Sequence, residues 1–135
     1  MTTVVVNKST NLLFDHNDTI ILTGKLTSLG IGYLSTNNAI YVKGSDDSIT
    51  MATGEDTIYD QGHGTQLYFN AKSFNEVVYG LQNDPKGFAE IITPSNLTYT
   101  MDGHNSIMVT GFGVSVDFKG FHSIAQLESH VRHVV

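Results

Sequence analysis

The chain has 135 residues, no cysteine and a formal net charge of −6 at pH 7. This length suits one domain or one module of a longer chain, and without cysteine neither a disulfide framework nor a zinc–thiolate site is available. Only seven lysines and arginines are present and they form no basic cluster, which argues against nucleic-acid binding, and no apolar run is long enough for a membrane-spanning helix.

The N-terminal segment MTTVVVNKSTNLLF has no charged region followed by a long apolar one, so it predicts no Sec signal peptide. The composition is rich in Thr, Ser, Asn and Gly, lacks Trp and is acidic, which suits a bacterial secreted or surface protein. We therefore expect a secreted or cell-surface location, with any export signal outside this segment.

A nine-residue repeat runs through the first half of the chain. Several of its apolar residues begin a short alternating pair, such as Ile40/Val42 or Ile49/Met51. An alternating pair predicts a very short strand with one buried face, and the Gly, Asn, Asp, Ser and Thr residues between the pairs predict chain reversals. The residues in phase are Leu13, Leu22, Ile31, Ile40, Ile49, Ile58 and Leu67.

Two nine-residue units make one flattened coil of a parallel β-solenoid, in which each strand stacks on a strand of the next coil. We predict that the fold is mainly β and that about residues 10–70 form a small parallel β-solenoid that is similar to a β-roll. The apolar residues from Leu22 to Leu67 would then be buried on two opposing sheets. The alternative is an antiparallel β-domain with a hairpin about every nine residues.

Residues from about 71 to 135 predict an α/β cap within the same single domain. Ser73 to Glu76 match a capping box ahead of an apolar helix face, which predicts a helix over residues 74–82. Apolar and polar residues alternate in the segments LTYTM, SIMVTG and VSVDF, which predicts an antiparallel meander of three strands. A second capping box, Ser123 to Gln126, predicts a helix over residues 124–134. Because a stacked array exposes strand edges at its end, we expect this region to cover them.

The segments DSI (Asp47–Ile49) and GEDTI (Gly54–Ile58) fit part of a known nonapeptide, G-G-x-G-x-D-x-U-x, where U is a large apolar residue. The chain thereby resembles the RTX (repeats-in-toxin) proteins and related bacterial type I secreted solenoids, over about two thirds of its length. The resemblance implies secretion, a parallel β-roll, and calcium ions held between successive turns by Asp carboxylates and glycine carbonyls.

The calcium ligands that this resemblance nominates are Asp47 and Asp56, with the carbonyl of Gly54. Residues 51–56 keep the fourth Gly and the Asp of the motif but not its first two glycines, and residues 42–47 keep only the Asp. Since Asp47 and Asp56 are one unit apart, we expect them on opposite sides of the coil, with Thr65 and Asn38 as their stacked neighbours. Calcium takes six to eight oxygen ligands. We therefore expect at most millimolar binding and a chain that folds without calcium.

Other side chains with metal-binding or catalytic chemistry form weaker patterns. His130 and His133 have the i, i+3 spacing of a helical metal site, but the spacing indicates no third ligand, and histidines in a last helical turn also interact with the helix dipole. Asp46–Asp47 and Glu55–Asp56 are adjacent acidic pairs. Neighbouring side chains point to opposite faces of an extended chain, so neither pair predicts a catalytic dyad. No nucleophile elbow, phosphate loop or His-Glu zinc motif occurs in the sequence.

The sequence thus favours a non-enzymatic structural or adhesion module of a secreted or surface RTX-like protein, with weak calcium binding at most. The alternative is a carbohydrate-binding or carbohydrate-modifying solenoid, for which the aromatic candidates in the repeats are Tyr33, Tyr41, Tyr59 and Tyr68. A third interpretation, an ice-binding solenoid, would need a full threonine ladder, which Thr19, Thr50 and Thr57 do not form. The expected partner is a glycan or another cell-surface ligand.

Overall fold

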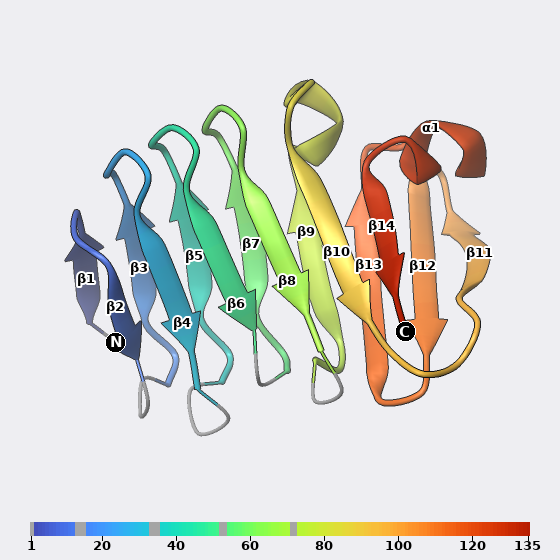
Figure 1. Cartoon of the computed structure of the whole chain (residues 1–135), viewed down its shortest axis with the longest axis horizontal. Coiled ribbons are helices and arrows are strands. Elements are labelled where there is room, and N and C mark those ends of the chain that lie inside the picture. Colours follow the sequence, from blue (N-terminus) through green and yellow to red (C-terminus); the bar gives the residue numbers. More distant parts are fainter. Residues whose placement is uncertain (1, 13–15, 33–35, 52–53, 71–72) are drawn as a thin grey trace.

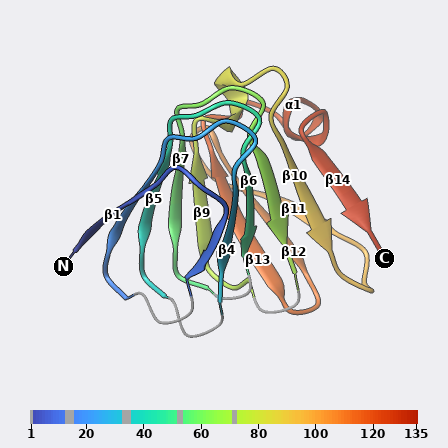
Figure 2. The ribbon, with the colours of Figure 1, turned by 60° about the vertical axis from the view of Figure 1, so that its left-hand side comes forward.

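The chain forms a β-solenoid whose coils stack along one axis (Figure 1). The structure is a computed structural model and describes residues 2–12, 16–32, 36–51, 54–70 and 73–135. Each coil contributes one short strand to each of two sheets that face each other across the core, and a region with a single short α-helix covers the C-terminal end (Figures 1 and 2). The predicted solenoid with a C-terminal α/β cap is confirmed.

The two sheets contain eight and six strands, and all pairs within the coils are parallel. The eight-stranded sheet has the order β1 (Thr3–Val6), β3 (Thr19–Leu22), β5 (Ala39–Val42), β7 (Thr57–Asp60), β9 (Glu76–Tyr79), β13 (Val114–Lys119), β12 (Ser106–Gly111) and β11 (Thr98–Gly103). The six-stranded sheet has the order β14 (Val131–Val134), β10 (Phe88–Ile92), β8 (Gln66–Phe69), β6 (Ser48–Met51), β4 (Ser28–Ile31) and β2 (Thr10–Leu12).

The core is built from the apolar residues of the nine-residue repeat. Side chains alternate between the core and the outer face along each strand, because the side-chain period of a strand is two. The repeat residues that are described are all buried and alternate between the two sheets: Leu22, Ile40 and Ile58 on the larger, and Ile31, Ile49 and Leu67 on the smaller. Leu13 and Tyr33 lie outside the described residues.

The strand register differs from a strict nine-residue phase. Leu22 pairs with Val42, whereas Ile40 pairs with Ile20 and Ile58. Equivalent corner residues are 20 apart between Asp18 and Asn38 but 18 apart between Asn38 and Asp56. A shift of two residues along a strand keeps a side chain on the same face. The nine-residue spacing therefore predicts burial correctly throughout, but it predicts the pairing only in the 18-residue coils, as for Ile40 with Ile58 and Ile49 with Leu67.

The corners before β3, β5, β7 and β9 of the larger sheet each use a residue with left-handed backbone, which most residues adopt at a cost. Asn tolerates this conformation better than other non-glycine residues, and Glu55 at one corner is a less favourable choice. Each of these residues directly precedes an acidic or amide side chain that points into the coil. The left-handed residues at these four corners are Asn17, Asn37, Glu55 and Asn75.

The Ile58→Ala variant should lose about 2–5 kcal/mol of unfolding free energy, because it removes apolar burial and leaves a cavity. Ile58 is fully buried in the middle of the stack, between Ile40 and Val78. Thr57→Ala on the same strand, whose side chain is only partly buried, is the matched control and should change stability much less. Equal losses in the two variants, measured by urea unfolding, would contradict the assignment of inward and outward positions.

The helix predicted over residues 74–82 is wrong. Residues Glu76–Tyr79 form strand β9, and only a 3₁₀ turn, η1 (Leu81–Asn83), follows it. The two presumed capping side chains make long-range contacts instead. Ser73 Oγ donates to the carbonyl of Met51, at 2.9 Å, and Glu76 Oε1 accepts from the amide of Asp56, at 3.2 Å. Pairing with β7 and β13 thus determines the conformation of this segment, and β9 with β10 continues the parallel stack.

The antiparallel meander is confirmed as β11, β12 and β13. The helix predicted over residues 124–134 is confirmed only in its first part, α1 (Ile124–Glu128). Ser123 Oγ accepts the amide of Gln126, at 3.1 Å, whereas the Gln126 side chain accepts the amide of His122 rather than that of Ser123. The chain then forms β14, which pairs in parallel with β10 and covers the edge of the smaller sheet. Strand pairing with β10 thus takes the place of the last turns of the predicted helix.

Candidate functional site

A column of polar side chains runs along the corner before the strands of the larger sheet. Each oxygen in it accepts a backbone amide from the preceding coil. Asn38 Oδ1 accepts from Asp18, at 2.9 Å, Asp56 Oδ1 from Asn38, at 2.8 Å, and Glu76 Oε1 from Asp56, at 3.2 Å. The column therefore satisfies corner amides that the strand ladders leave free.

A second column lies at the corner that leads into the smaller sheet. Asp47 Oδ1 accepts the amide of Thr27, at 2.7 Å. Asp84 accepts the amides of Gly64, at 2.8 Å, and Thr65, at 3.0 Å, and Asp60 Oδ1 accepts from the hydroxyl of Thr65, at 2.7 Å. These carboxyls too bind groups of the coil itself.

The two nominated calcium ligands, Asp47 and Asp56, belong to these two different columns. Their expected placement on opposite sides of the coil is confirmed, as are their stacked neighbours: Gln66, which follows Thr65, donates its amide to the Asp47 carbonyl, and Asn38 donates to Asp56. Gly54 lies in the turn before Asp56, and a Cβ there would meet the Phe74 carbonyl at 2.1 Å. No three His, Asp or Glu side chains are grouped for a metal ion within the ranges that the structure describes.

Calcium should change the thermal midpoint very little. A site with millimolar affinity adds only about 0.4 kcal/mol at 1 mM calcium, because the gain depends on the ratio of ligand concentration to dissociation constant. Circular dichroism and melting in excess chelator, in 1 mM calcium and in 1 mM magnesium provide the comparison. A large calcium-specific gain of structure would contradict this expectation and support the complete RTX-like ligand set.

The buried carboxyls titrate far from their ordinary range. Burial raises the pKa of Asp56 to about 7 and that of Glu76 to about 10, despite the amide hydrogen bonds that favour their ionised forms. Burial also raises the pKa of Asp47. Each of these three side chains has one buried oxygen without a hydrogen-bond partner among the described residues. Glu76 is therefore protonated at neutral pH.

Asp60 and Asp84 form a carboxyl pair between consecutive coils. Burial and a hydrogen bond to Asp84 raise the pKa of Asp60 to about 8. Burial also acts to raise the pKa of Asp84, but hydrogen bonds from Asp60, Thr65 and Gly64 outweigh it and lower that pKa. The two pKa shifts have opposite directions, so at neutral pH the proton lies on Asp60 and Asp84 is ionised.

The adjacent acidic pairs do not form dyads, as the sequence predicts. Asp46 and Glu55 are exposed and have left-handed backbone, whereas Asp47 and Asp56 point into the coil.

His130 and His133 do not lie on one helix, so the helical spacing expected for them is wrong. His130 Nδ1 lies 2.9 Å from the Gly87 carbonyl, and His133, in β14, places Nε2 3.1 Å from the Thr93 carbonyl. Both rings contact backbone oxygens.

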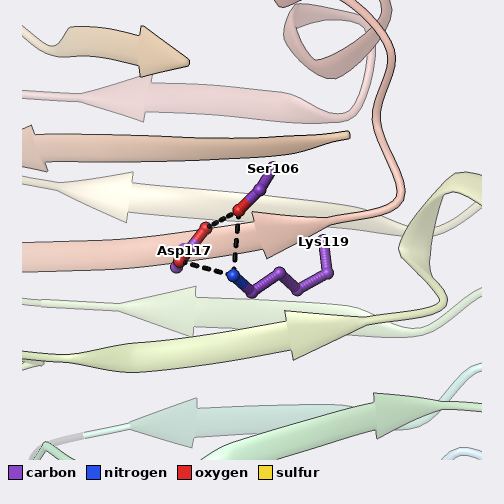
Figure 3. Close-up of polar contacts among 3 residues, drawn as sticks. All are labelled: Ser106, Asp117 and Lys119. Carbon is purple, nitrogen blue, oxygen red and sulfur yellow. Dashed lines mark hydrogen bonds and ion pairs between the residues drawn. The ribbon is translucent and has the colours of Figure 1, made fainter. Parts of the chain in front are cut away.

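A Ser–Asp–Lys cluster on β12 and β13 was not singled out from the sequence (Figure 3). Lys119 Nζ lies 2.9 Å from Asp117 Oδ2 and donates to Ser106 Oγ, at 2.9 Å, while Ser106 donates to Asp117 Oδ1, at 2.8 Å. A hydrogen bond to Asp117 raises the pKa of Lys119, so the amine stays protonated. A serine nucleophile needs a neighbouring base. The cluster acts as a polar clamp between two strands, and the alternation in VSVDFK was the sequence signal for it.

The most regular outer feature is a stack of three tyrosine rings on the larger sheet. The ring centroids of Tyr41 and Tyr59 are 4.6 Å apart and those of Tyr59 and Tyr79 are 5.2 Å apart, with interplanar angles of 9° and 8°. We call these residues the tyrosine ridge. Their side chains align because Tyr41, Tyr59 and Tyr79 occupy one outward position in β5, β7 and β9. The central ring, Tyr59, has both faces covered by its neighbours and presents its edge and hydroxyl to solvent.

The outer face of the smaller sheet differs in character. It has a hollow of about 350 Å³ over Gly30, lined largely by small polar side chains of Asn11, Ser28, Ser48 and Thr50. Farther along this face, Tyr68 Oη donates to Gln66 Oε1 at 2.9 Å. The outer face of the larger sheet thus carries stacked tyrosines, whereas that of the smaller sheet combines small hydroxyl side chains with an edge-to-face contact between Tyr68 and Phe88.

Comparison of the chain with protein-family models, with curated proteins and with solved structures found no match. Neither described helix is long and apolar enough to cross a membrane.

Proposed function

We propose that the protein is a non-enzymatic structural or adhesion module of a secreted or cell-surface RTX-like protein. Its contact surface is the outer face of the larger sheet, centred on the tyrosine ridge. The observation that carries this proposal is the ridge itself. Stacked, ordered tyrosines offer a large amphipathic contact area at a low cost in side-chain entropy, and tyrosine is enriched at binding hot spots.

The use of the reactive side chains supports a non-catalytic role. The carboxyls with strongly raised pKa values are buried and accept hydrogen bonds from the coil, so they have no access to a substrate. Ser106 is buried, and its hydroxyl already donates to Asp117, whose carboxylate is paired with Lys119. Calcium, if it binds near Asp47, Gly54 or Asp56, does so weakly and is not needed for the coil.

The carbohydrate-binding alternative is less well supported by the same ridge. A sugar ring stacks on a free aromatic face, whereas in the ridge both faces of the Tyr59 ring are covered by Tyr41 and Tyr79. The phenol edges and hydroxyls suit a flat partner surface that accepts hydrogen bonds. We therefore favour a cell-surface ligand other than a simple glycan.

Binding of labelled protein to intact bacterial and mammalian cells, with a glycan array in parallel, tests the proposal. The variant Tyr41→Ser/Tyr59→Ser/Tyr79→Ser should lose at least about tenfold in cell binding, because each hot-spot residue contributes more than about 1 kcal/mol. The matched control changes the opposite outer face, Ser28→Ala/Ser48→Ala/Thr50→Ala, and should bind like the wild type. Unchanged binding by the tyrosine variant would refute the surface, and release of sugar products from polysaccharides would refute the non-enzymatic role.

A further inference from the structure

The N-terminal end of the solenoid leaves the edges of both sheets open. In the described part of the chain, β1 pairs only with β3 and β2 pairs only with β4, and no element covers this end (Figures 1 and 2). A hollow of about 380 Å³ lies here, lined by β1, β2 and the turn between them. Val4 and Leu12 at this end are only partly buried although they pack on the core.

The backbone groups that face outward can be assigned from the pairing. The carbonyls of Thr2 and Val6 accept amides of Thr19 and Thr23, so these residues direct their backbone groups toward β3. Successive residues of a strand alternate in this direction. Thr3 and Val5 therefore present their N–H and C=O groups to the open edge. By the same alternation, Leu12 bonds to Gly32 of the next coil and Asn11 faces outward on β2.

The two ends of the solenoid differ in edge protection. Strands β1 and β2 contain no charged residue, and Val5 is 63% exposed. At the other end, edge strand β11 has a register irregularity between Met101 and Gly103 and carries Asp102, and edge strand β14 carries Arg132. Bulges and charges block strand pairing, whereas an apolar, uncharged edge invites it.

We propose that two copies of this chain dimerise head to head through β1 and β2. A two-fold axis perpendicular to the sheets places β1 antiparallel to β1 of the other copy and β2 antiparallel to its counterpart. Thr3 of one copy then exchanges hydrogen bonds with Val5 of the other, and the two Val4 side chains meet inside and close the hollow. A second copy fits because it presents two strand edges at the same separation, whereas a single extended peptide would cover one edge only.

The charges near this end are compatible with that arrangement. The two-fold axis reverses the strand direction, so Lys8, in the turn after β1, lies at the end of the interface opposite to Lys8 of the other copy. Each Lys8 instead approaches the corner before β1 of the other copy, where Asp18 accepts the amide of Thr2. Because the charged C-terminal edges disfavour head-to-tail stacking, the assembly closes as a dimer and does not extend into a filament.

Sedimentation equilibrium of the whole chain tests this proposal. The wild type should show twice the 14.7 kDa chain mass. Val5→Pro removes an amide that faces the open edge and leaves the bonds to β3 intact, and proline is tolerated on edge strands. It should weaken dimerisation at least tenfold. Val135→Pro, at a position that is 88% exposed at the other end, is the matched control and should remain dimeric.

Val5→Lys provides a second variant that keeps the backbone amide and places like charges close together across the interface. It decides the matter if circular dichroism shows that Val5→Pro does not fold. A monomeric wild type at high micromolar concentration, species that grow beyond the dimer, or a Val5→Lys variant that dimerises like the wild type would each overturn the proposal.

Discussion

At pH 8 the Glu76→Gln variant should be more stable than the wild type by several kcal/mol, and at pH 4 the two should be nearly equal. The carboxyl of Glu76 is fully buried, and burial raises its pKa from an ordinary value of 4.5 to about 10. The folded chain therefore keeps a proton that the unfolded chain releases above about pH 4.5. Between these two pKa values, each pH unit costs the wild type about 1.4 kcal/mol of stability. Glutamine has no proton to lose and retains an oxygen for the Asp56 amide.

The wild type itself should lose stability as the pH rises from about 4 toward 8. Asp56 and Asp60, with pKa values of about 7 and about 8, act in the same direction as Glu76. The contribution of each of these three carboxyls to the free energy of unfolding is complete only below the pKa that the group has in the unfolded chain. Urea unfolding at each pH measures the effect, with Glu128→Gln, on the exposed side of α1, as the control. A pH-independent difference between Glu76→Gln and the wild type would show that Glu76 is ionised in the fold.

A chain that ends at His122 should aggregate and should melt well below the full-length protein. It lacks α1 and β14, and with them the fully buried Leu127. The loss of this side chain alone should lower the free energy of unfolding by about 2–5 kcal/mol, as a Leu→Ala substitution in a core does. The edge of β10 then becomes open, because the amides of Ala89 and Thr93 lose the carbonyls of His130 and Val134. An apolar open edge promotes association between chains.

Light scattering and thermal melting of the truncated chain measure this result. Deletion of Val135 alone, which makes no strand pair, is the control and should leave the thermal midpoint unchanged. A soluble truncated chain with an unchanged midpoint would mean that the C-terminal segment does not protect the smaller sheet.

The sequence by itself determined the solenoid and the identity of its core. Apolar residues such as Ile40, Ile49 and Ile58 recur at a spacing that two short strands and two turns can satisfy, and polar residues that tolerate left-handed backbone lie between them. These are local properties, since side-chain alternation and turn preference act over a few residues. The same local logic placed Asp47 and Asp56 on opposite sides of the coil.

Only the tertiary structure decided which coils align and what the polar side chains do. Coils of 18 and 20 residues set the register, and that register stacks Tyr41 on Tyr59 and Tyr79. Ser73 and Glu76 bind other coils instead of capping a helix, and the segment after Glu128 joins β10 as a strand. Each outcome depends on partners about 20 or more residues away in the chain. A local pattern cannot specify those partners, because the free energy of such a contact exists only once the coils are stacked.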